Sequence, residues 1–301
     1  MNAAANKTRH RHSTPMLKLI EFLARRAPGL LLACGALLGF MVYALRLKRR
    51  QVVEINLELV FPELALPERR ALARRNLVST GRGMAELLIA WRTPLERLPR
   101  AEIKGLQHLR AAQKSGRGVL LLTAHTHPIE LGIRLLREAL NEPVHALARE
   151  HNQLKLQAWI DAGRRAQMGP TYQKREVRAM LQALRKGALV AYAPDQNFNT
   201  QSEFLQFFNI PAATLVSWPR MLKAADALPL TLLTARTKDG YLLEIGEAFA
   251  GIPSADPAHD TQRYLSRVEA FVRRYPEQYL WAHRRFKKRP SAEVQLYPKV
   301  R

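Results

Sequence analysis

Residues 116–135 read GRGVLLLTAHTHPIELGIRL and contain the junction between an expected strand and an expected helix. The apolar run at 119–122 has the length and composition of a buried strand, and apolar residues recur at helical spacing from position 129 onward. His125 and Glu130 stand five positions apart between these two elements. This spacing can place a base at the end of the strand and its orienting carboxylate on the first turn of the helix.

His125 and Glu130 have the side chains that activation of a hydroxyl group requires. An alcohol is a poor nucleophile at neutral pH, and a histidine within hydrogen-bond reach can take its proton as it attacks a thioester. A carboxylate on the other ring nitrogen fixes the tautomer and stabilises the imidazolium. The H-x4-E spacing is common in unrelated proteins, so its meaning depends on the rest of the chain.

The chain is strongly basic, with 48 Lys and Arg against 25 Asp and Glu in 301 residues and a formal net charge of +23. Such an excess indicates polyanionic surroundings: nucleic acid, anionic lipid or a phosphorylated substrate. The hydrophobic content of 47% is enough for a substantial core, which excludes a disordered protein. Cys34 is the single cysteine, so the fold does not depend on a disulfide.

The first fifty residues differ in composition from the rest. Basic residues dominate positions 1–26, and residues 27–45 contain no charge. A helix over this uncharged stretch is just long enough to cross a bilayer core. Because Lys and Arg flank both of its ends, the positive-inside rule gives no orientation. We therefore predict a basic N-terminal unit at 1–50 with a membrane helix at about 27–45, which spans the bilayer or lies in its interface, and a second domain at 51–301.

Strand and helix patterns alternate through the second domain. Strands are expected at 119–122, 144–148, 188–193, 230–235 and 241–245, and helices at 129–139, 153–165, 177–184, 213–225 and 261–274. This alternation predicts an α/β fold with a mixed, mostly parallel sheet flanked by helices, in which ligands collect at the carboxyl ends of the strands. Asp195 follows one expected strand as His125 follows another, so both are expected at that edge.

Three further segments accompany the H-x4-E pair. They are INLELVFPEL at 55–64, MLQALRKGALVAYAPDQ at 180–196 and PEQYLWAHRRFKKRP at 276–290. With the basic N-terminus and its apolar stretch, they occur in the order found in the late acyltransferases of lipid A biosynthesis, the lauroyl and myristoyl transferases. The sequence resembles this family over nearly its whole length, and the resemblance implies a fold like that of the glycerolipid and lysophospholipid acyltransferases.

The resemblance also implies an activity and a set of site residues. A fatty acyl group would pass from acyl carrier protein to a hydroxyl of a lipid A precursor, on the cytoplasmic side of the bacterial inner membrane, without a metal or an organic cofactor. By their positions, His125 matches the family's base and Glu130 its partner. Arg149, Arg164 and Asp195 match residues that bind substrate.

The basic segment WAHRRFKKR at 281–289 adds two candidates. Arg284 and Arg285 are expected to grip phosphates or acidic sugars of an anionic membrane lipid or lipid A precursor. Thr126, His127 and Pro128 depart from the family's usual residues after the histidine. The acceptor therefore stays open, and another glycolipid or a lysophospholipid is an alternative.

Two alternatives come from other classes of protein. His125 and His127 also form the H-x-H of metal-dependent hydrolases, with Glu130 and Asp195 as further oxygen ligands. The net charge alone would also suit a membrane-tethered nucleic-acid binder. The remaining histidines are badly placed for a second metal cluster, and the sequence contains no recognised nucleic-acid module, so acyl transfer is favoured with no metal and no nucleic acid.

Overall fold

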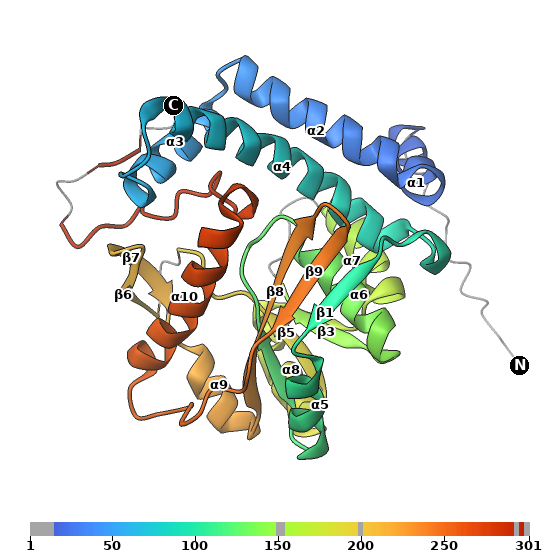
Figure 1. Cartoon of the computed structure of the whole chain (residues 1–301). Coiled ribbons are helices and arrows are strands. Elements are labelled where there is room, and N and C mark those ends of the chain that lie inside the picture. Colours follow the sequence, from blue (N-terminus) through green and yellow to red (C-terminus); the bar gives the residue numbers. More distant parts are fainter. Residues whose placement is uncertain (1–14, 149–153, 198–200, 292–294, 298–301) are drawn as a thin grey trace, which may run out of the picture.

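The computed structural model describes residues 15–148, 154–197, 201–291 and 295–297. Its centre is a seven-stranded sheet in the order β1-β9-β8-β2-β5-β3-β4, and a separate antiparallel pair is formed by β6 and β7 (Figure 1). All pairs in the large sheet are parallel except β8 with β9. The expected α/β fold with a mixed, mostly parallel sheet is confirmed.

The strands are β1 Ala101–Lys104, β2 Val119–Leu122, β3 Val144–Leu147, β4 Thr171–Tyr172, β5 Leu189–Tyr192, β6 Ser202–Phe207, β7 Ile210–Leu215, β8 Leu228–Thr237 and β9 Gly240–Ile245. The helices are α1 Pro15–Arg26, α2 Pro28–Ala44, α3 Lys48–Val60, α4 Leu66–Arg92, α5 Leu106–Lys114, α6 Ile129–Leu140, α7 Leu154–Gln167, α8 Val177–Arg185, α9 Trp218–Ala225 and α10 Pro257–Arg274. Short 3-10 turns lie at η1 Leu95–Arg97, η2 Lys174–Glu176 and η3 Pro276–Gln278.

Helices cover both faces of the sheet, because its central strands are buried on both sides. In β2, Leu120 and Leu122 belong to one hydrophobic cluster, whereas Val119 and Leu121 belong to the other. Alternate residues of a strand point to opposite faces, so this division marks two separate cores. The first cluster includes residues of α8, α9 and α10, and the second includes residues of α4, α5 and α6.

One sequence expectation for local structure was wrong, and one strand at the sheet edge was missed. The helix expected at 213–225 occupies only Trp218–Ala225, because the residues before it form β7. β7 pairs with β6 in register from Ser202↔Leu215 to Phe207↔Ile210. The apolar residues of this hairpin were interpreted as helical because short apolar runs do not distinguish the two structures. The strand β1 at the sheet edge was not expected.

The N-terminal helices lie against α4, and Figure 1 shows α2 running along it. Glycines bring the two backbones into contact: a Cβ added at Gly35 would lie 2.4 Å from the carbonyl oxygen of Gly81, and one at Gly39 would lie 2.1 Å from that of Leu77. Within the part of the chain that the structure describes, no single helix is both long and apolar enough to cross a membrane. Only the pair α2 and α3, bent by 82°, reaches that length and composition together.

Candidate active site

His125 and Asp195 lie at the same edge of the sheet. β2 and β5 are parallel neighbours, with Leu122 in register with Tyr192, and each strand is followed within three residues by one of the two side chains. The amide of Thr123 donates to the carbonyl of Tyr192 at 2.8 Å, which keeps the two loops together as they leave the sheet. Sheet register therefore brings together residues that are 70 positions apart.

Asp195 holds His125 through one hydrogen bond to its ring and one to its backbone. One carboxylate oxygen lies 2.5 Å from Nδ1 of His125, and the other accepts from the backbone amide of His125 at 2.9 Å. The hydroxyl of Tyr279 donates to the second oxygen, also at 2.9 Å. The Asp195 side chain is fully buried, whereas that of His125 is 30% exposed. Because Nδ1 faces the carboxylate, Nε2 is the ring nitrogen left for a substrate.

The charge of Asp195 is stabilised by its surroundings. Burial raises the pKa of this carboxyl, but the facing His125, its hydrogen bonds and the charge of Arg285 outweigh burial and lower the pKa to about 2. The carboxylate is therefore ionised at neutral pH. A fixed negative charge at Nδ1 selects the tautomer with its lone pair on Nε2 and stabilises the imidazolium that forms when Nε2 takes a proton.

Glu130 has different partners from those expected. Its carboxylate accepts two hydrogen bonds from Arg164, one of them from Nε at 3.2 Å, and one from the indole of Trp91 at 2.9 Å. The expected pairing of Glu130 with the ring of His125 is thus replaced by an ion pair with Arg164. The carboxylate on Nδ1 of His125 comes from a distant strand end instead of the first turn of α6.

Tyr279 is a site residue that the sequence reasoning missed. Its segment joins the loop of His125 through an isolated bridge with Thr126, and the amide of Leu280 donates to the carbonyl of His125 at 3.0 Å. Burial and the nearby charge of Asp195 raise the pKa of the Tyr279 phenol well above its ordinary value, so it remains a hydrogen-bond donor. The signal available was its place inside the segment 276–290, which had been interpreted only through its basic residues.

The two arginines of that segment differ in environment. Arg285 is fully buried and donates to the carbonyl of Ala213 at 2.7 Å and to the hydroxyl of Thr214 at 2.6 Å. It cannot grip a phosphate in this position, and its expected role in substrate binding is wrong for this structure. Arg284 is half-buried, with its guanidinium 5.8 Å from the ring centre of Tyr297. Arg149 lies outside the described residues.

The geometry around His127 does not suit the metal-hydrolase alternative. Its Nδ1 lies 2.8 Å from the hydroxyl of Ser79 and its Nε2 lies 3.0 Å from that of Thr80, so both ring nitrogens are engaged by α4. Burial and the charge of Arg236 lower the pKa of His127 to about 3. No group of three or more His, Cys, Asp or Glu side chains in the described part of the chain could hold a metal ion.

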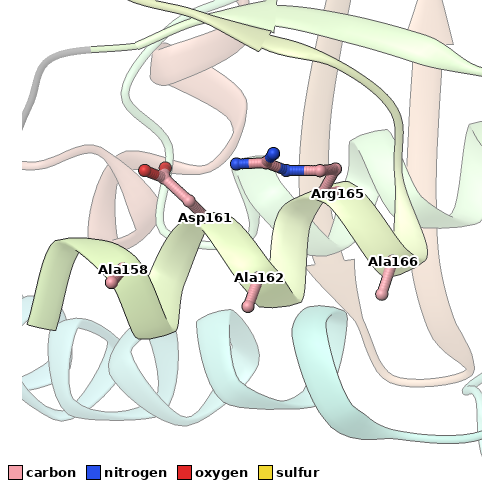
Figure 2. A pocket seen from close by; sticks show the side chains of 5 residues that line it. All are labelled: Ala158, Asp161, Ala162, Arg165 and Ala166. Carbon is pink, nitrogen blue, oxygen red and sulfur yellow. The ribbon is translucent and has the colours of Figure 1, made fainter. Parts of the chain in front are cut away.

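An open hollow of about 570 Å³ lies on α7, away from these contacts. Figure 2 shows its lining residues on consecutive turns of that helix: Ala158, Asp161, Ala162, Arg165 and Ala166. Arg164, which binds Glu130, is not among them. The hollow is therefore a feature of the outer face of α7 and not of the site around His125.

Comparison with known proteins gives a consistent result. Residues 16–288 match the family model described as bacterial lipid A biosynthesis acyltransferase. The chain is 33% identical over 270 residues to the lipid A biosynthesis palmitoleoyltransferase of Escherichia coli K12, with 87% of each chain covered. It is 33% identical over 273 residues to the lipid A biosynthesis lauroyltransferase of the same organism, covering 88% of this chain and 87% of the relative. Identity to the myristoyltransferase of that organism is 26% over 268 residues, covering 87% of this chain and 82% of the relative.

Proposed function

The chain belongs to the family of bacterial lipid A biosynthesis acyltransferases and is thus an enzyme of acyl transfer to lipid A; from this premise we propose its donor, its chemistry and its location. The donor is the thioester of an acyl carrier protein, and the acceptor is a hydroxyl of a lipid A precursor. The observation that carries the mechanism is the contact between His125 and the buried carboxylate of Asp195.

The proposed reaction uses Nε2 of His125 as the general base. Nε2 takes the proton of the acceptor hydroxyl while the oxygen attacks the thioester carbonyl. The tetrahedral intermediate collapses, the bond between carbon and sulfur breaks, and the imidazolium returns the proton to the departing thiolate. Asp195 stabilises the imidazolium through Nδ1, and Tyr279 holds the carboxylate in place. These steps use no metal and no organic cofactor.

Glu130 and Arg164 have a second role in this proposal. The carboxylate of Glu130 is held by Trp91 on one side and pairs with the guanidinium of Arg164 on the other, which fixes the position of Arg164. A fixed guanidinium can stabilise negative charge on an acceptor or on the oxygen of the tetrahedral intermediate. Glu130 is therefore required for transfer although its carboxylate does not orient His125.

The N-terminal helices supply a surface for membrane binding. Large apolar side chains that are more than half exposed lie on α1 and α2: Met16, Leu19, Phe22, Leu30, Leu37 and Leu38. Basic residues border them at Arg25, Arg26 and Lys48. Apolar surface with a basic border suits an anionic lipid interface. We place the enzyme on the cytoplasmic side of the bacterial inner membrane, with 1–50 as anchor and 51–301 as the acyltransferase domain.

Mass spectrometry of lipids from bacterial cells with and without the gene tests the acceptor. The proposal predicts one additional fatty acyl group on lipid A species when the gene is present, and none when it encodes His125→Ala. Acylation of a lysophospholipid or of another glycolipid, with lipid A unchanged, would contradict the acceptor. The acyl chain length is read from the mass added.

A further inference from the structure

A cavity of about 420 Å³ lies beside α4, outside the contacts around His125. Its walls come from α4, from the end of β8 and from the turn around η3. Arginines from two of these elements line it: Arg74, Arg75 and Arg82 from α4, and Arg236 from β8. Four guanidinium groups around one cavity make it a candidate site for an anion.

Arg236 forms the fixed part of this cavity. Its guanidinium binds the carboxylate of Glu86 through two hydrogen bonds of 2.7 and 2.8 Å, and Tyr241 donates to the same carboxylate at 2.6 Å. Glu86 is 1% exposed and Arg236 is 15% exposed, so the pair is largely shielded from water. Arg236 is thereby held rigidly at the cavity wall.

The charges of the other three arginines that line the cavity are not paired with any acidic side chain that the structure describes. Arg74, Arg75 and Arg82 are exposed, and within the described residues none of them makes an ion pair or a side-chain hydrogen bond. Glu277 is the one acid that lines the cavity, so positive charge is in excess there. Guanidinium groups bind phosphate oxygens through paired, charge-assisted hydrogen bonds, which makes a phosphate the anion that fits best.

The cavity is connected to the loop that carries His125. The hydroxyl of Ser79 accepts from Arg236 at 3.2 Å and contacts Nδ1 of His127 at 2.8 Å. The carbonyl of Gln278, another lining residue, accepts from the amide of His127 at 2.8 Å. A ligand in the cavity would thus lie one side chain away from the segment that positions the base.

We propose that this cavity binds a phosphate group on the headgroup of the acceptor lipid while a hydroxyl of the same lipid reaches His125. This inference rests on the proposed transfer to a phosphorylated lipid A precursor and adds the site that holds its phosphate. The size of the open cavity and the polar groups of Thr237, Glu277 and Gln278 suit a phosphate attached to a hydroxylated ring.

The test removes the three unpaired charges together. Arg74→Gln, Arg75→Gln and Arg82→Gln are combined in one variant, which leaves Arg236 and its buried partner unchanged. The control combines Arg178→Gln, Arg220→Gln and Lys223→Gln, which removes the same charge from exposed positions of α8 and α9 at the opposite end of the molecule from α4 (Figure 1). Steady-state transfer is measured with a phosphorylated lipid A precursor and with the same lipid after enzymatic dephosphorylation.

Loss of three charge-assisted contacts should raise KM for the phosphorylated acceptor by about 10- to 100-fold, with kcat within about twofold of wild type. The control should keep the wild-type KM. With dephosphorylated lipid, wild type and the cavity variant should have the same, raised KM. An unchanged KM in the cavity variant, or a rise in KM for the acyl carrier alone, would overturn the assignment.

A direct binding measurement separates this inference from the proposed reaction. Isothermal titration of the full chain with glucose 1-phosphate should give binding that glucose does not give, and the cavity variant should lose it while the control retains it. If transfer to the lipid fails but this pattern holds, the reaction is wrong and the phosphate site stands. If transfer occurs but the cavity variant binds glucose 1-phosphate as wild type does, the site is wrong.

Discussion

Replacing Asp195 with Asn tests the pairing that the structure assigns to the base. The substitution keeps the size of the side chain and removes its charge. Nδ1 of His125 then faces a neutral amide at the position where a carboxylate oxygen lay 2.5 Å away. The amide cannot stabilise the imidazolium as the carboxylate does, and it can favour the tautomer with its proton on Nε2. We therefore expect a loss in kcat with little change in KM.

The magnitude follows from the electrostatics of the buried carboxyl. A pKa lowered from 3.8 to about 2 corresponds to roughly 2.5 kcal/mol in favour of the ionised form, or a factor of about 60. This pKa combines the effect of burial with those of His125 and Arg285, so it sets the scale of the electrostatic interaction at the carboxyl and not the share of one partner. The same substitution in Ser-His-Asp hydrolases lowers kcat about 10⁴-fold. The expected loss for Asp195→Asn lies between about 10² and 10⁴.

Single-turnover transfer of a labelled acyl group from the carrier to the lipid acceptor measures this loss without interference from product release. Asp239→Asn is the matched control, because Asp239 is exposed in the turn between β8 and β9 and an Asn-Gly pair suits such a turn. The control should transfer at the wild-type rate. A rate for Asp195→Asn within about threefold of wild type, in a variant that unfolds as wild type does, would refute the role of the carboxylate.

Three further predictions concern packing, pH and the tyrosine of the site. Gly35→Ala should destabilise the protein by about 1–3 kcal/mol in urea unfolding, because its Cβ meets the backbone of α4, whereas Gly29→Ala, with no atom within 4 Å, should not. His127 is buried and neutral, and its pKa is about 3 in the folded protein against 6.5 in the unfolded chain. Between pH 7 and pH 5 the unfolded state gains this proton and the folded state does not, so the free energy of unfolding should fall by about 2 kcal/mol. In the same urea titrations, the free energy of unfolding of His127→Gln should fall correspondingly less over this pH range. Tyr279→Phe should lower kcat about 10-fold, since Asp195 loses a donor at 2.9 Å, and unchanged kcat would exclude a positioning role.

The strands that form the site could be predicted from the sequence because their apolar runs are bounded by polar residues. The expected strands at 119–122 and 188–193 correspond to β2 and β5, and their register places His125 and Asp195 at one edge. The partner of the histidine could not be predicted from spacing. A local interpretation favours Glu130, which is five positions away, whereas the carboxylate on Nδ1 comes from 70 positions away and depends on which strands are neighbours.

Burial of charged residues was the other feature that spacing did not reveal. Arg285 stands in a run of basic residues that is typical of an exposed anion-binding tail. The chain turns this arginine toward β7, whose carbonyl and hydroxyl groups accept hydrogen bonds from its two terminal nitrogens, and its aromatic neighbours Trp281 and Phe286 are fully buried. Three of the four arginines that do line a cavity lie on α4, and the sequence analysis did not single them out.

The most direct measurement of the central claim is single-turnover acyl transfer by two single variants, whose substituted residues lie two positions apart in the sequence. His125→Ala should lower the transfer rate by at least about 10³-fold, because the general base is lost, while His127→Gln should keep it within about 10-fold of wild type. Both variants should unfold cooperatively at neutral pH, which separates chemistry from folding. Transfer by His125→Ala at a rate comparable with wild type, or complete loss only in His127→Gln, would contradict the assignment of His125 as the base.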